Sequence, residues 1–295
     1  MGKTPKKKSG GSKNKKAPST KNFDNLPPFI SLESFLGDLG ADSDEGERSP
    51  LDAAQDLIYD AFETQSKARR IALAKKALTI STDCADAYNL LAEEEASNLA
   101  EKIRIYTQAV EAGERAIGRK GFREMGGHFW GFLETRPYMR ARLGLALCLW
   151  EAGDGEKAIV HVQDMLRLNP NDNQGMRYIL LLWLIEKDML ADAEELLTRY
   201  KGDPMAWMLY SKALVKFKKD GASKAANTAL AKAIKENSHV PDYLLSRKNF
   251  PRRLPGHYGF GDDNEAVLYA VDAKKGWQLS TGALDWLAAQ VRCLE

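Results

Sequence analysis

The stretch from Met139 to Pro170, "MRARLGLALCLWEAGDGEKAIVHVQDMLRLNP", decides the fold. It predicts two amphipathic helices, because apolar residues recur at steps of three and four on each side of the turn "AGDGEK". Ala146 on the first helix and Ala158 on the second are small, so the two backbones can approach closely. The Asn-Pro pair at 169–170 is typical of the end of a helix. The stretch therefore predicts a helical hairpin.

The hairpin recurs along the chain. Ala193 and Ala226 occupy the same small position as Ala158, at spacings of 35 and 33 residues. Hairpins that cannot bury their own apolar face stack into a solenoid. The spacing, the turn and the Pro after the second helix resemble tetratricopeptide repeat proteins over residues 65–240. We therefore expect an all-α fold, a tetratricopeptide-type helical-hairpin solenoid of four to five helix pairs.

The C-terminal segment leaves the repeat and carries a second resemblance. Its markers are "HVPDYLL" at 239–245, "GDDNEA" at 261–266, Trp277 and "GAL" at 282–284. These resemble the closing region of the suppression-of-tumorigenicity-7 family, whose members are predominantly membrane-associated eukaryotic proteins. The sequence contains no run of about 18 apolar residues that would span a bilayer. The resemblance thus implies a shared helical module, not a shared location, and no catalytic activity. Asp262 or Asp263 is expected to cap a helix here.

The N-terminal region has opposed blocks of charge. The first 21 residues carry eight lysines and no acid, and residues 24–52 carry eight acids against one arginine. Such blocks are typical of a solvated, disordered tail. One short amphipathic helix, Ser31–Leu39 with Ser31 as N-cap, is possible in it and could dock on its own domain or on a partner. The lysines either solubilise the tail or make weak, salt-sensitive nucleic-acid contacts.

These features predict three parts of the chain. Residues 1–50 form the tail, residues 51–248 the solenoid with an insert at 119–138, and residues 249–295 a C-terminal helical capping module. The three cysteines are far apart and show no metal-ligand spacing, which favours reduced intracellular thiols. We expect a cytoplasmic protein, or a nuclear one in a eukaryote, without a membrane span, cofactor, metal, enzymatic activity or small-molecule substrate.

The first candidate partner-binding site is the insert, extended to residue 142. It breaks the repeat period and mixes aromatic area with charge, as interface hot spots do. The candidate residues are His128, Trp130, Glu134, Arg136, Tyr138 and Arg140. Pro137 is expected in the first turn of the next helix. The alternative is packing, with Trp130 and Phe132 folded over the preceding helix pair and Glu134 paired with Arg140 or Arg142.

The second candidate opens the next repeat. Asn173, Gln174, Arg177 and Tyr178 begin a first helix of a pair, and in tetratricopeptide proteins these helices line a concave groove that holds extended peptides. The compatible alternative is a satisfied helix cap at Asn171 or Asp172. The sequence therefore predicts a non-enzymatic scaffold that binds a peptide or partner protein. The alternative function is a nucleic-acid- or ribosome-associated adaptor that uses the lysine-rich tail.

Overall fold

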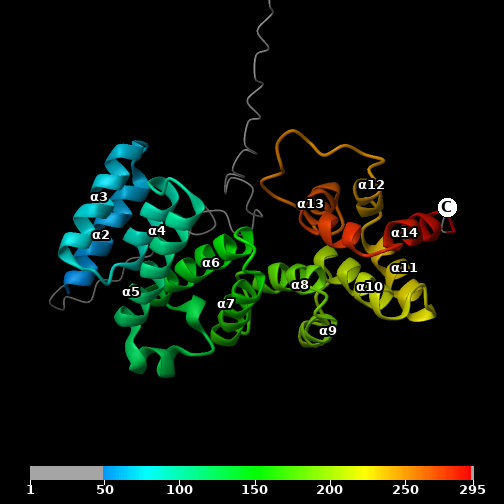
Figure 1. Cartoon of the computed structure of the whole chain (residues 1–295), viewed down its shortest axis with the longest axis horizontal. Coiled ribbons are helices and arrows are strands. Elements are labelled where there is room, and N and C mark those ends of the chain that lie inside the picture. The colour runs from blue at the N-terminus through cyan, green and yellow to red at the C-terminus, as the bar shows by residue number, and fades with distance from the viewer. Residues whose placement is uncertain (1–48, 294–295) are drawn as a thin grey trace, which may run out of the picture.

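The computed structural model describes residues 49–293, which form α-helices, two 3-10 turns and no strand (Figure 1). The predicted helix Ser31–Leu39 and the lysine-rich tail lie outside the described residues. The first helices are α2 (Pro50–Glu63), α3 (Lys67–Ile80), α4 (Ala85–Glu94), α5 (Leu99–Met125), α6 (Arg136–Glu151), α7 (Gly155–Leu168) and α8 (Met176–Glu186). The others are α9 (Leu190–Arg199), α10 (Ala206–Asp220), α11 (Lys224–Glu236), α12 (Val240–Leu244), α13 (Asp263–Leu279) and α14 (Ala283–Arg292).

Five consecutive helix pairs, α2/α3 to α10/α11, form the solenoid and confirm the predicted all-α repeat architecture. The first helix of each pair is called an A helix below and the second a B helix. Ala158, Ala193 and Ala226 are fully buried on their B helices, as the spacing predicts. The predicted caps are also present: Pro137 lies in the first turn of α6, and Asp262 accepts a hydrogen bond from the Glu265 amide at the start of α13.

The predicted insert is only partly irregular. Helix α5 continues to Met125 across a kink at Gly118, whose φ of 61° is in the left-handed region that suits glycine. The irregular part is therefore the short connection from Gly126 to Thr135, with the 3-10 turns η3 (Phe129–Gly131) and η4 (Leu133–Thr135). Periodicity missed the extra helical turns because they fall outside the 34-residue repeat.

Helix α13 covers the A helices α8 and α10 at one end of the solenoid, and α14 packs on the last pair, α10 and α11 (Figure 1). Helix α13 contacts both α8 and α10, and Gly276 lies so close to α8 that an added Cβ would be 3.4 Å from Ile185. Trp207 of α10 is fully buried beside Tyr258 and Tyr269, with ring centroids 5.7 and 6.0 Å apart. In this half of the solenoid the A-helix side is thus filled by the chain itself.

Asp272 on α13 makes this packing sensitive to pH. The Trp207 indole N–H donates to its carboxyl group at 3.1 Å, and burial raises the pKa of Asp272 from 3.8 to about 7. Between about pH 4 and pH 7, Asp272 is therefore protonated in the folded state but ionised in the unfolded state. The free energy of unfolding consequently falls as the pH rises through this interval.

We expect Asp272→Asn to remove this cost, because the amide oxygen can still accept the indole hydrogen bond. Because part of the Asp272 side chain still contacts solvent, the gain should be about 2 kcal/mol at pH 8 and near zero at pH 4. Urea denaturation of both proteins at pH 4, 6 and 8 measures the difference. Parallel stability curves for the two proteins across this range would contradict the assignment.

Candidate partner-binding surface

The connection between α5 and α6 is anchored on its inner side. Phe129 is fully buried and its ring packs against Phe122 of α5 and Tyr138 of α6, with centroids 5.1 and 6.2 Å apart. The buried Thr135 hydroxyl donates to backbone carbonyls inside the connection, among them that of Phe132 at 3.0 Å. The amide of Gly127 donates to the Leu168 carbonyl at the end of α7 at 2.9 Å. Packing and hydrogen bonds therefore hold this connection in one conformation. The connection, residues 126–135, is called the α5–α6 corner below.

The outer side of the α5–α6 corner presents apolar side chains and charged groups to solvent. The Arg136 guanidinium lies over the half-buried Trp130 ring at 5.5 Å from the centroid, and its Nε donates to the Trp130 carbonyl at 3.1 Å. Phe132 and Leu133, at the joint of the two 3-10 turns, remain 40% and 43% exposed. His128 and Glu134 are exposed beside them. Cation, aromatic ring and exposed apolar side chains together are typical of a protein contact surface.

Two expected features of the packing alternative are absent here. Glu134 is exposed, and the arginines expected to pair with it have other partners: Arg140 pairs with Asp86 and Arg142 with Asp164. Phe132 is 40% exposed, whereas Trp130 is partly buried against the hydrophobic core, as the packing alternative expects. Tyr138, in contrast, is 2% exposed and accepts a hydrogen bond from Arg142 at 2.8 Å, so it serves packing.

The Asp86–Arg140 pair joins three A helices. Asp86 of α4 is fully buried, and Arg140 of α6 donates to its carboxylate through two nitrogens, Nε at 2.7 Å. Gln55 of α2 donates to the same carboxylate at 3.1 Å, and Asn89 donates to it at 3.0 Å. Burial, and secondarily the Asp86 charge, raise the pKa of the Tyr59 hydroxyl beside this pair. The residues near α6 indicate Arg140 as a candidate, but its partners are distant in sequence and no local pattern identifies them.

The second candidate set ties α8 to the neighbouring repeat. Asp172 accepts from the amides of Met176 and Arg177 at 2.7 and 2.9 Å, which confirms the expected cap at one of its two positions. Arg177 pairs with Asp172 at 2.8 Å and with Asp203 at 2.6 Å, and the Tyr178 hydroxyl donates to Asp203 at 2.9 Å. These charges are therefore used inside the fold.

The other residues of the second candidate site do not form a groove with Arg177. Gln174 and Tyr178 are buried at 8% and 5% exposure, whereas Asn173 is exposed and accepts a hydrogen bond from Asn169 at 2.8 Å. The signal for this burial was present in the sequence: "MRYILLLWLI" at 176–185 is apolar on nearly all sides, which predicts a helix covered all round.

Several ionisable groups of the described chain are buried, and burial shifts their pKa values. No group of three or more His, Cys, Asp or Glu residues with metal-binding geometry occurs between residues 49 and 293. Burial, and secondarily Arg142, lower the pKa of His161 to about 4, and burial raises the pKa of the Cys84 and Cys148 thiols to about 12. No helix in this part of the chain combines the length and the apolar character that crossing a bilayer requires.

Comparison with solved structures finds a helical-repeat neighbour. It is the structure titled "YrrB: a TPR protein with an unusual peptide-binding site", with a TM-score of 0.44 and 21% identity. The match covers 63% of this chain and 84% of that one.

Comparison with curated proteins finds relatives at similar identities. A "Suppressor of tumorigenicity 7 protein-like" of Danio rerio is 27% identical over 267 residues, and that of Bos taurus is 29% identical over 253 residues. A "Protein ST7 homolog" of Drosophila pseudoobscura pseudoobscura is 30% identical over 259 residues. These matches cover 82%, 78% and 79% of this chain but only 45%, 45% and 47% of the relatives. The chain thus spans less than half their length. The ST7 protein family model matches residues 42–292, and the chain belongs to that family.

Proposed function

We propose that the protein is a non-enzymatic interaction scaffold that binds a segment of a partner protein along the α5–α6 corner and the adjoining A-helix side of α2, α4 and α6. The observation that carries the proposal is the outer side of the corner. Trp130 and Arg136 form a stacked pair there, next to the exposed Phe132 and Leu133. Because the inner side is fixed by Phe129 and Thr135, binding would cost little ordering entropy.

The proposed contact set contains the exposed and half-exposed candidates, namely His128, Trp130, Glu134, Arg136 and Arg140. Arg136 and Arg140 are one turn apart on α6, so both lie on the same side of that helix. An acidic or backbone carbonyl group of the partner would meet Arg136, while an apolar side chain would cover Phe132 and Leu133. Tyr138, Gln174 and Tyr178 would support this surface from within the fold, and Asn173 and Arg177 would lie outside it.

Replacing Trp130 and Arg136 together with alanine should weaken partner binding at least tenfold, because one hot-spot pair is worth about 2 kcal/mol or more. Partners are identified by affinity capture and mass spectrometry on the intact protein, and the dissociation constant is then measured with the purified partner. The melting temperature should stay within a few degrees of the parent value, because neither side chain is fully buried.

Val160→Ala is the control, since Val160 is 59% exposed on α7 and does not belong to the proposed contact set. It removes exposed apolar area and should leave partner binding unchanged. A large loss of stability in the Trp130→Ala/Arg136→Ala variant together with unchanged capture would overturn the proposed surface.

A second candidate function is a nucleic-acid- or ribosome-associated adaptor, favoured by the eight lysines among the first 21 residues. Binding of this kind should weaken steeply with salt and be lost when residues 1–22 are deleted. Partner capture that survives this deletion favours the protein-binding scaffold instead.

A further inference from the structure

A groove of about 240 Å³ lies between α9, α10 and α11, apart from the α5–α6 corner. Leu197, Met208, Leu209 and Ala229 supply apolar lining. Four lysines also line the groove, namely Lys201, Lys212, Lys216 and Lys232. An apolar groove with cationic side chains along it suits an amphipathic segment that carries acids beside its apolar side chains.

The charge of these lysines is not compensated within the described chain. On α10, Lys218 and Lys219 pair with Asp188 and Glu194 at 3.0 and 2.6 Å, but no described carboxylate forms an ion pair with a lysine of the groove. The acid in the lining, Asp203, is already bonded to Arg177 and Tyr178. Four like charges around one groove repel one another, so an anionic occupant would be stabilised there.

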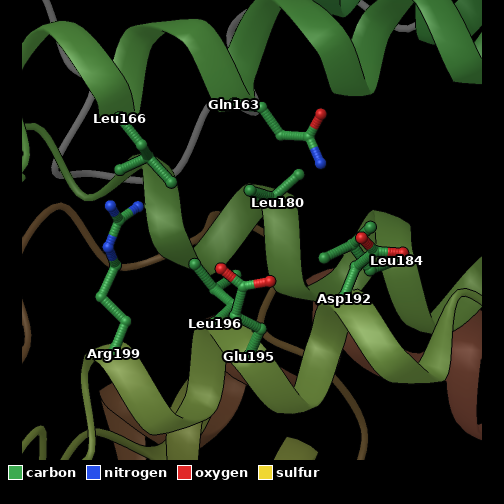
Figure 2. A pocket seen from close by; sticks show the side chains of 8 residues that line it. All are labelled: Gln163, Leu166, Leu180, Leu184, Asp192, Glu195, Leu196 and Arg199. Atoms are coloured by element: carbon green, nitrogen blue, oxygen red, sulfur yellow. The ribbon is translucent and has the colours of Figure 1, made fainter.

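The equivalent groove one repeat earlier has a different charge. Figure 2 shows this pocket of about 130 Å³, in which Asp192, Glu195 and Arg199 of α9 surround leucines of α7, α8 and α9. When Ala193 and Ala226 are aligned, Asp192 and Glu195 correspond to Ala225 and Thr228 in the lysine-lined groove. The groove itself thus follows from the repeat geometry, whereas the uncompensated positive charge is particular to α9–α11.

The chain contains a segment of the matching chemistry outside the described residues. Residues 29–47, "FISLESFLGDLGADSDEGE", carry six acids and no lysine or arginine. Phe29, Leu32, Leu36 and Leu39 recur at steps of three and four, as required for one apolar helix face. The segment therefore combines apolar side chains for the groove lining with carboxylates for the four lysines.

The segment is poorly placed to reach the groove of its own molecule, because even a fully extended linker only just matches the length of the solenoid between them. Residues 40–48 span at most about 32 Å, at about 3.6 Å per residue. Helix α2 and the groove lie at opposite ends of the solenoid, and the A helices from α2 to α10 are separated by four packing steps of about 8–10 Å each. We propose that the acidic segment 29–47 of one molecule docks in the lysine groove of a second copy, as a head-to-tail contact independent of the function proposed above.

Sedimentation of the full chain at concentrations from about 1 to 200 µM tests the proposal, with peptide 27–47 as a second probe. The wild type should self-associate, and labelled peptide should bind to it. Lys212→Glu/Lys216→Glu should weaken both at least tenfold, as should Asp42→Lys/Asp44→Lys/Glu45→Lys in the segment. Combining the two sets of reversals in one chain should restore self-association, because the charges are again complementary.

Lys224→Glu/Lys235→Glu is the matched control, because these two lysines are exposed on α11 outside the groove lining and their reversal should preserve peptide binding. Circular dichroism verifies that each variant is folded, and the restored double reversal excludes misfolding as the cause. The proposal is overturned if no self-association and no peptide binding occur up to about 200 µM. It is also overturned if a single-stranded oligonucleotide binds through Lys212 and Lys216 while the segment reversals change nothing.

Discussion

Asp86→Ala is expected to lower the free energy of unfolding by about 3–5 kcal/mol, the largest effect of any single change on the A-helix side. The substitution leaves the Arg140 guanidinium, whose side chain is 18% exposed, without its buried carboxylate partner. It also removes the acceptor of the Gln55 and Asn89 amide groups. Removing one member of a buried ion pair costs more than the net worth of the pair, because that member no longer compensates the desolvation of the charge that remains.

Urea denaturation monitored by circular dichroism and by tryptophan fluorescence measures the loss. Because α2, α4 and α6 meet at this carboxylate, hydrogen exchange should accelerate in all three helices of the variant. Asp86→Asn should lose less than the alanine variant, since an amide oxygen can still accept one hydrogen bond.

Asp83→Ala provides a control only three residues away. Asp83 also pairs with an arginine, Arg115 at 2.7 Å, but the two side chains are 40% and 51% exposed. An exposed pair of this kind contributes between zero and about 1 kcal/mol. If Asp83→Ala and Asp86→Ala lowered the free energy of unfolding equally, burial would not be the reason why the Asp86–Arg140 pair stabilises the fold.

The sequence was sufficient to predict the repeat, because helix pairing depends on local periodicity. The alanines at the helix crossings and the caps of α6 and α13 follow from residue type and spacing within one repeat. The five stacked pairs follow in turn, since each hairpin has an apolar face that only a neighbour can cover.

The distant polar partners could not be predicted in the same way. Arg140 lies 54 residues from Asp86, and nothing in the sequence near α6 identifies that carboxylate. From the sequence alone, Glu134 was an equally reasonable partner for Arg140, because the two residues are close in the chain. The choice depends on how α4 and α6 stack, so it appears only once the solenoid is assembled.

The covering of the A-helix side at α8 could have been predicted from the sequence. A helix whose apolar residues extend all round, as in α8, requires a cover on the side where a ligand-binding helix would be open. In this chain α13 supplies that cover, and the sequence after the last repeat is long enough to do so. The repeat pattern predicts a partner-binding role for Arg177 and Tyr178. The apolar run that follows them predicts instead that this helix is buried.

Trp207→Ala should be the second largest loss of stability, about 3–5 kcal/mol, because Trp207 is fully buried between α8, α10 and α13. The indole ring also donates the hydrogen bond that Asp272 accepts, so its removal leaves this partly buried carboxyl group without that donor. Since repeats contact only their neighbours, the damage should remain in the C-terminal half of the solenoid.

Hydrogen exchange separates this local loss from global unfolding. Amides of α13 should lose protection in Trp207→Ala, while those of α2 to α7 keep it, because α13 depends on Trp207 for its contact with the A helices. Trp207→Phe keeps part of the aromatic area but loses the five-membered ring of the indole and the hydrogen bond to Asp272, so it should cost less than the alanine variant. If protection were lost uniformly from α2 to α14, the C-terminal helices would unfold together with the whole solenoid, and the expected local loss would be wrong.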